Sequence, residues 1–187
     1  MLFLFYSAAL VLATAVARGA SIQCHDRIST GWLNARKNSL NGQEIPLWIS
    51  DATGKLVTAG DVQNGVFVFP CTSKAIGKPA TTISADNKTI TVYGQMRPFS
   101  GNSCLARNLS DSSVGLAPCQ TEDTLAKQQT QFWRISLDWT GGPEAFGVDK
   151  VVTFVAPGVY NHLANRQWYE STYKPPSTWY LTFTWSE

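Results

Sequence analysis

The stretch Val114-Gly115-Leu116-Ala117-Pro118-Cys119 decides how this sequence is interpreted. It predicts a short strand that stops at a proline, because proline has no N–H group to donate to a sheet ladder. The same local shape recurs at residues 66–71 (Val-Phe-Val-Phe-Pro-Cys) and 153–158 (Thr-Phe-Val-Ala-Pro-Gly). The three prolines lie roughly 40 to 50 residues apart, and such a period predicts three similar units. No single unit of this size can bury its own apolar face, so we expect the three to share one core.

Strand signals fill much of the remaining chain. In Trp179–Trp185 the odd positions are Trp, Leu, Phe and Trp, an alternation that places them on one face of a strand. Seven other runs predict strands, at residues 45–49, 66–69, 89–93, 114–117, 132–137, 151–155 and 167–170. No window of 12 residues has a capped helical pattern. Many short strands divided by turn residues favour an all-β barrel or sandwich.

The composition limits the possible classes of partner. The 187 residues suit one domain or at most two small ones. Charged residues make up 15% of the chain and the net charge is +2, with no cluster of Lys or Arg. We therefore expect neither nucleic acid nor a membrane surface as a partner. Seven tryptophans supply large apolar side chains for a core.

The N-terminal residues read as a targeting segment that lies outside the fold. Residues 2–17 are almost wholly apolar, but the run is shorter than the ~20 residues that cross a bilayer. Ala15, Ala17 and Gly19 supply the small residues of a cleavage site. We expect a secretory signal peptide over residues 1–19, with a short N-terminal anchor as the alternative. Residues 20–187 then form one secreted, extracellular domain without membrane insertion.

The cysteines form an even set: Cys24, Cys71, Cys104 and Cys119. In an oxidising compartment such a set predicts two disulfides, for which three pairings are possible. One pairing joins Cys104 to Cys119 across a loop of about 15 residues and leaves Cys24 for Cys71. No C-x-x-C motif is present, so we expect no metal site and no cofactor.

Two sequons predict a glycoprotein. They are Asn87-Lys88-Thr89 and Asn108-Leu109-Ser110, with Asn87 and Asn108 as the acceptors. Asn108 lies between Cys104 and Cys119, and a glycan there would crowd any pocket in that unit.

One segment points to a family. Cys104-Leu105, then residues 114–119, then Gln131-Phe132-Trp133 together resemble one repeat of the ricin B-type lectins, which are β-trefoils with a Gln-x-Trp motif. The resemblance is weaker over residues 54–71 and faint around Gln167-Trp168. It implies a β-trefoil with pseudo-threefold repeats, two disulfides including one between Cys104 and Cys119, and a buried Trp133.

The resemblance also implies where a sugar would bind. In this family a sugar lies against an aromatic residue before Pro-Cys, while an acidic or amide side chain after Cys-Leu binds its hydroxyls. The unit with the best match has Ala117 and Ala106 at these positions and has lost both contacts. The unit that ends at Cys71 keeps more of the chemistry, so the expected carbohydrate-binding residues are Thr58, Asp61, Asn64 and Phe69, together with the amide of Gln131. A second polar-aromatic cluster comprises Tyr160, Asn161, His162 and Asn165.

Four functions compete, one of which is a structural or interaction role with no small-molecule site at all. A secreted, non-catalytic carbohydrate-binding protein with glycans or glycoproteins as partners is favoured. The alternative is a secreted β-trefoil protease inhibitor, for which Arg107 and Lys127 are the candidate basic residues in loops. An enzyme is disfavoured, because no carboxylates stand at a spacing that selects a pair and no Gly-x-Ser-x-Gly elbow is present.

Overall fold

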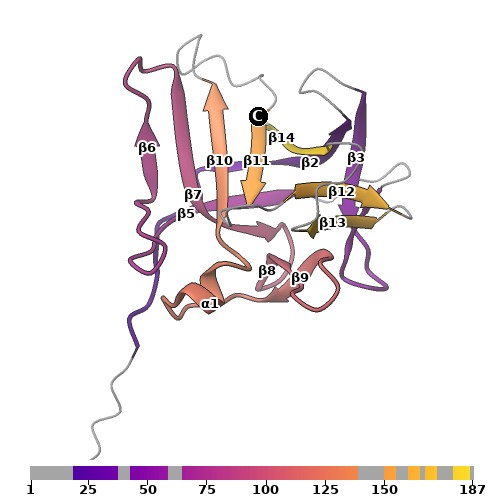
Figure 1. Cartoon of the computed structure of the whole chain (residues 1–187), viewed down its shortest axis with the longest axis horizontal. Helices are drawn as coiled ribbons and strands as arrows, with labels where there is room; N and C mark the ends of the chain where they lie inside the picture. Colours follow the sequence, from indigo (N-terminus) through magenta and orange to yellow (C-terminus); the bar gives the residue numbers. More distant parts are fainter. Residues whose placement is uncertain are drawn as a thin grey trace, which may run out of the picture.

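The computed structural model describes residues 19–37, 43–58, 65–138, 150–154, 160–164, 167–171 and 179–185. This part of the chain is all-β, as predicted, with one helix of four residues (Figure 1). The strands are β1 (Gln23–Cys24), β2 (Ser29–Lys37), β3 (Glu44–Ile49), β4 (Leu56–Thr58), β5 (Val66–Thr72), β6 (Thr81–Ile83), β7 (Thr89–Pro98), β8 (Ser103–Arg107), β9 (Val114–Pro118), β10 (Trp133–Asp138), β11 (Lys150–Phe154), β12 (Tyr160–Ala164), β13 (Gln167–Ser171) and β14 (Trp179–Trp185). The helix α1 spans Leu125–Gln128, between β9 and β10.

Six strands are joined by antiparallel pairings that return to their starting point. β2 pairs with β5, β5 with β7, β7 with β10, β10 with β11, β11 with β14, and β14 with β2. Between them lie three pairs of shorter strands, β3–β4, β8–β9 and β12–β13. The short β1 and β6 add to the outer edges of β5 and β7.

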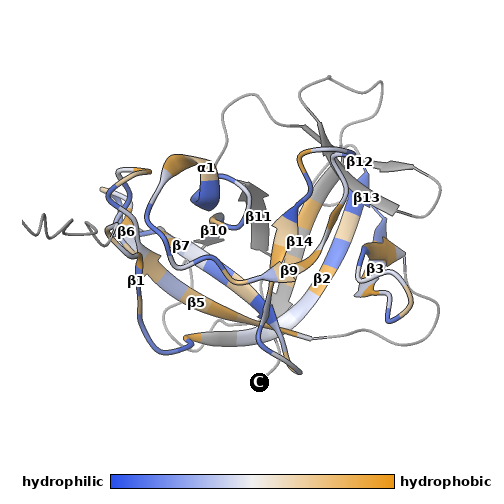
Figure 2. Cartoon of the chain, turned by 90° about the horizontal axis from the view of Figure 1, so that it is seen from below, coloured by the Kyte–Doolittle hydropathy of each residue, from blue (hydrophilic) through white to orange (hydrophobic). Residues whose placement is uncertain are grey.

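The core is formed by the inward-facing residues of these strands. Val66 and Val68 of β5 are buried, as are Leu181 and Phe183 of β14, so both strands show the period of two. Figure 2 shows hydrophobic and hydrophilic residues mixed along β2, whereas β5 is mainly hydrophobic, since Phe67 and Phe69 occupy its other face. Trp133 is fully buried, as expected, and its indole N–H donates to the carbonyl of Leu105 at 2.9 Å.

One expectation about the prolines is wrong. The strand β5 does not stop at Pro70 but continues to Thr72. The ladder survives because the carbonyl of Pro70 accepts from His25 N–H at 2.8 Å, and β1 pairs with β5 immediately beyond. Strand β9 does end at Pro118. Pro157 lies outside the described residues.

Of the two disulfides, one connects strands that are distant in the sequence and the other closes a single hairpin. Cys24–Cys71 joins β1 to β5, and Cys104–Cys119 links the start of the β8–β9 hairpin to the residue after it. This is the pairing that the ricin B-type resemblance implies for Cys104 and Cys119.

Candidate functional site

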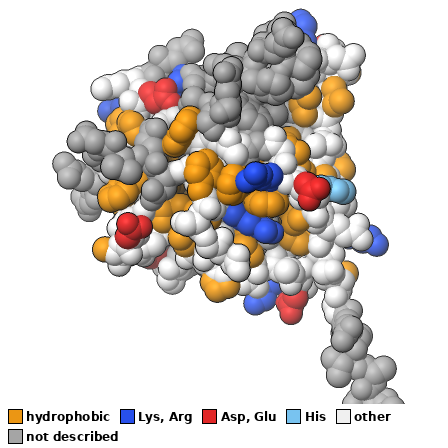
Figure 3. Space-filling model, turned by 180° about the vertical axis from the view of Figure 1, so that it is seen from behind, with side chains coloured by type: hydrophobic (Ala, Val, Ile, Leu, Met, Phe, Trp, Pro, Cys, Tyr) orange, Lys and Arg blue, Asp and Glu red, His pale blue; other side chains and the backbone are white. Residues whose placement is uncertain are grey.

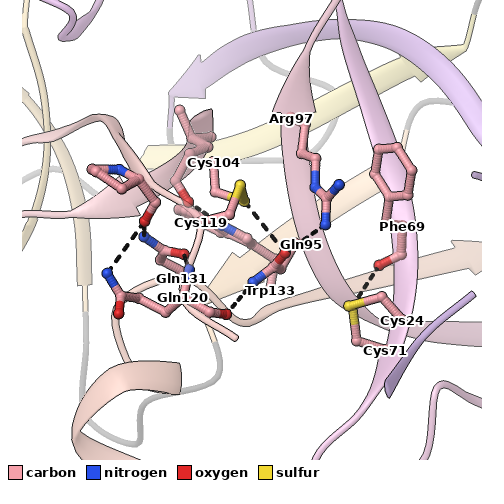
Figure 4. The surroundings of a disulfide bond; sticks show 12 residues. Cys24, Phe69, Cys71, Gln95, Arg97, Cys104, Cys119, Gln120, Gln131 and Trp133 are labelled. Carbon is pink, nitrogen blue, oxygen red and sulfur yellow. Dashed lines mark hydrogen bonds between the residues drawn. A yellow bond between two sulfur atoms is a disulfide. The ribbon is translucent and has the colours of Figure 1, made fainter. Parts of the chain in front are cut away.

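Gln131 lies in the interior, between α1 and β10. Its side chain is 1% exposed, its Oε1 accepts from Gln120 N–H at 2.8 Å, and its Nε2 donates to the Pro118 carbonyl at 2.8 Å (Figure 4). The amide therefore holds the end of β9 against the start of β10. A buried amide with both polar atoms engaged does not face a ligand in solvent, so we exclude it from the candidate site.

Two further glutamines, which the sequence analysis did not single out, complete this network. Gln95 Nε2 and Gln128 Nε2 both donate to the Gln120 carbonyl, at 3.0 and 3.2 Å, and Gln128 Nε2 also donates to the Glu122 carbonyl at 2.7 Å. Gln95 and Gln128 are almost fully buried. Side-chain amides thus replace a sheet partner for the segment that follows β9, and they fix its course.

Phe69 lies on β5, and its ring is partly covered. The guanidinium carbon of Arg97 lies 4.2 Å from the ring centroid, a cation–π contact (Figure 4). The ring of Phe67 meets it edge to face, with 6.4 Å between the centroids. Burial lowers the pKa of the Arg97 guanidinium from its usual value. One face of Phe69 is therefore occupied by a side chain of the protein itself.

The structure describes only some of the other predicted site residues. Thr58 ends β4 and is half-buried, and neither Thr58, Phe69 nor Gln131 lines either of the two cavities described below. Asp61 and Asn64 lie outside the described residues, as does Asn165. For Tyr160, Asn161 and His162 the structure describes only the backbone of β12.

A cavity of about 220 Å³ does combine an exposed ring with a carboxylate. Phe99, which follows β7, is 48% exposed, and Asp51 reaches the same cavity from the turn after β3. The remaining lining residues are Ile49, Gly65, Pro98, Ser100 and Leu116. An apolar ring face, a carboxylate acceptor and the Ser100 hydroxyl thus converge on one small space.

Local backbone contacts position both side chains. Phe99 N–H donates to the Gly65 carbonyl at 3.0 Å, and the ring packs on Phe67 with centroids 4.6 Å apart. A Cβ at Gly65 would collide with the Phe99 ring, so glycine allows the ring to lie where it does. Asp51 stands in a turn closed by the Gly54 N–H, which donates to the Ser50 carbonyl at 2.7 Å. From the sequence, Asp51 marks only a turn and Phe99 falls outside every predicted strand.

A larger cavity of about 360 Å³ lies between the β3–β4 turn and the β8–β9 hairpin. Leu116 N–H donates to the Gly54 carbonyl at 2.7 Å, and Lys55 Nζ lies 2.8 Å from the carboxylate of Asp111. The hydrogen bond from Lys55, with further bonds from Ser113, lowers the pKa of Asp111 to about 2. No aromatic side chain lines this cavity, which makes it a poorer sugar site than the first.

Both sequon asparagines are exposed. Asn108 lines the larger cavity, and its Oδ1 accepts from the N–H and hydroxyl of Ser110 at 2.9 and 2.8 Å. Asn87 lies in the turn between β6 and β7 with a φ of 56°. A glycan on Asn108 would stand at the larger cavity, whereas Asn108 does not line the cavity of Phe99 and Asp51.

Neither a scan against protein-family models nor a search of curated proteins matched this chain. Among the described residues, no group of three or more His, Cys, Asp or Glu side chains is arranged to hold a metal ion. No helix within those residues has the length and apolar character needed to cross a membrane.

Proposed function

We propose that the protein is a secreted β-trefoil that binds carbohydrate without catalysing a reaction. Six antiparallel pairings that lead from β2 back to β2 support a barrel. Each hairpin of short strands lies between two of these six in the chain, so the order of elements repeats three times. The two disulfides support a protein made in an oxidising compartment.

The convergence of Phe99 and Asp51 on one cavity is the observation that carries the proposal. A sugar ring has an apolar C–H face, which packs on an aromatic ring, and hydroxyl groups, which donate to a carboxylate. The cavity of about 220 Å³ is smaller than the ~300–1,000 Å³ typical of drug-sized ligands. It therefore suits one sugar ring of a glycan that continues into solvent.

The competing functions gain less support. A protease inhibitor must present an exposed residue on an extended loop, whereas Lys127 lies within α1 and Arg107 within β8. A glycosidase needs two carboxyl groups about the scissile bond, and Asp51 is the one carboxylate among the residues that line the Phe99 cavity. Binding without catalysis is the function that fits this site best.

Binding to a glycan array, followed by titration of the strongest neutral ligand, tests the proposal. Phe99→Ala removes the stacking surface and should weaken binding by about tenfold or more. Asp51→Asn keeps the shape of the side chain, removes its charge and should weaken binding by a similar factor. Ile83→Ala, at an exposed position on β6, is the matched control and should bind as the wild type does.

Two results would contradict the proposed site. If Phe99→Ala and Asp51→Asn both bind the glycan as tightly as the wild type does, the binding site is not at this cavity. If Phe69→Ala is the one variant that loses glycan binding, the binding site is at Phe69, as the family resemblance implies. Absence of any glycan ligand on the array would end the carbohydrate-binding proposal itself.

A further inference from the structure

Beside the Phe99 cavity, aromatic and basic side chains form a continuous strip on the outer face of β5 and β7. Phe67 and Phe69 alternate with the buried Val66 and Val68, so their rings lie on the opposite face of β5 from the main core. Both are half-buried, and Phe69 also packs against a smaller buried cluster of Cys71, Tyr93 and Phe132. The β5–β7 register places Arg97 opposite Phe67, hence on the same face. We call the set Arg27, Phe67, Phe69, Arg97 and Phe99 the Arg–Phe strip.

Each of the two guanidinium groups lies over an aromatic ring. The Arg27 guanidinium carbon lies 4.4 Å from the Phe67 centroid, and that of Arg97 lies 4.2 Å from the Phe69 centroid. The N–H groups of a guanidinium lie in its own plane, so those that reach solvent can donate to an acceptor beside the ring. The Nε–H of Arg97 is buried and is not among them. One of the five N–H groups of Arg97 donates a hydrogen bond to Gln95 Oε1, at 3.0 Å.

The strip has two positive charges, those of Arg27 and Arg97. Among the described residues, no ion pair includes Arg27 or Arg97. Lys55 and Arg36, by contrast, each have a carboxylate partner, Asp111 and Glu44. Figure 3 shows basic side chains lying directly among hydrophobic ones on the face behind that of Figure 1. Two cations on an aromatic surface are complementary to a ligand with apolar ring faces and carboxylates.

We infer that the Arg–Phe strip binds an acidic polysaccharide, a polymer of uronic acids whose carboxylates pair with Arg27 and Arg97. This inference rests on the proposed carbohydrate binding and names its ligand class. Phe99 belongs both to the cavity and to the strip, because its ring contacts Phe67 at a centroid distance of 4.6 Å. A chain with one sugar in the cavity therefore continues onto the strip.

The size of the strip favours a glycan over a protein partner. A stable protein interface uses about 20–30 residues on each side, whereas five side chains form the strip. A few linked sugars span such a surface, and bidentate pairs between guanidinium and carboxylate groups then fix their direction.

Calorimetric titration with two matched oligosaccharides tests the inference. One is an oligomer of polygalacturonate, and the other is the same oligomer with its carboxyl groups methyl-esterified. The wild type should bind the acid form at least about tenfold more tightly than the ester. Arg27→Gln and the double variant Arg27→Gln/Arg97→Gln should lose this preference. Lys127→Gln removes one exposed positive charge from α1 and should retain it.

The variants and probes separate the possible failures. If the Arg97→Gln change in the double variant lowers the melting temperature sharply, the single variant Arg27→Gln tests the inference by itself. Arg27 is exposed, so its substitution should not disturb the fold. Equal affinity for acid and ester, or a preference that survives Arg27→Gln, overturns the inference. Binding of poly-glutamate as tight as that of polygalacturonate also overturns it, since the strip would then recognise any polyanion or an acidic protein. Neutral-glycan binding that depends on Phe99 while the acid oligomer fails to bind leaves the proposed function standing and removes only this inference.

Discussion

A single glycine shows how tightly strands β5 and β7 are joined. Gly94 on β7 lies opposite Pro70 on β5, and a Cβ at this position would collide with the backbone carbonyl of Phe69. The neighbouring N of Cys71 would also stand within 2.8 Å of that atom. Backbone in the middle of a paired strand cannot move aside as a side-chain tip can, so we attribute the glycine to this close approach.

Gly94→Ala should therefore lower the free energy of unfolding by about 2–3 kcal/mol, the range typical of overpacked sites. Urea denaturation of the wild type and the variant measures the change. Gly65→Ala serves as the comparison, because its Cβ would meet the Phe99 ring, an exposed side chain that can turn away. If Gly94→Ala and Gly65→Ala lower the free energy of unfolding equally, a Cβ that meets backbone is no more destabilising than one that meets a side chain.

The sequence predicts the role of a residue well where that role follows from the residue type and its local spacing. Cys104 and Cys119 stand at the spacing of a known repeat, and Trp133 is large and apolar, so a disulfide and a buried ring were predictable. Asp51 and Phe99 were not, because they are far apart in the sequence and only the pairing of several strands brings them to one cavity. The amide of Gln131 signals hydrogen bonding, but nothing in the sequence indicates that its partners are backbone groups.

The same contrast holds for whole elements. β14 was predicted in full from its strict alternation, and the burial of Leu181 and Phe183 matches it. β2, which pairs with both β5 and β14, gave a poor signal because Asn34 and Arg36 are buried polar residues that interrupt the apolar pattern. β6 has three exposed residues and α1 four residues, so neither is long enough to show a period.

The ion pair between Lys55, beside the β3–β4 turn, and Asp111, in the β8–β9 hairpin, should depend on pH. The Lys55 hydrogen bond and those from Ser113 lower the pKa of Asp111 from 3.8 to about 2. A carboxyl group with a depressed pKa in the folded state stabilises the fold fully above pH 3.8. That stabilisation is lost as the pH falls from 3.8 to about 2.

Asp111→Asn should lower the free energy of unfolding at neutral pH by less than about 1 kcal/mol, because the pair is largely exposed to solvent. The difference from the wild type should shrink as the pH falls through about 2, because Asp111 in the folded wild type is half protonated at its pKa of about 2 and mostly protonated below it. Denaturation curves across this range measure it. A difference that stays constant from neutral to acid pH would show that the Asn acts through the turn and not through charge.

At the scale of the molecule, the N-terminal residues connect parts that the six paired strands leave separate. We call residues 20–28 the N-terminal strap. Its Ala20 carbonyl accepts from Asp123 N–H at 2.7 Å, and its Ile22 N–H donates to the Thr121 carbonyl at 2.9 Å. Farther along, His25 and Ile28 bond to β5, and Cys24 is bonded to Cys71. The strap therefore ties the segment after β9 to β5, and it also holds Arg27 over Phe67.

The two disulfides should differ in how much they stabilise this arrangement. Cys24 and Cys71 are 47 residues apart, whereas Cys104 and Cys119 are 15 apart. A longer closed loop restricts the unfolded chain more, which corresponds to about 4 kcal/mol for the first bond and about 3 kcal/mol for the second. The paired variant Cys24→Ala/Cys71→Ala should therefore unfold at a lower urea concentration than Cys104→Ala/Cys119→Ala.

In Cys24→Ala/Cys71→Ala, amide hydrogen exchange should rise in the strap, while β10, which pairs with β7 and β11, stays protected. If the strap stays protected from amide exchange in Cys24→Ala/Cys71→Ala, its hydrogen bonds to Thr121, Asp123 and β5 hold it without the disulfide. If Cys104→Ala/Cys119→Ala is instead the less stable variant, the Cys104–Cys119 bond stabilises the fold through the packing around Trp133.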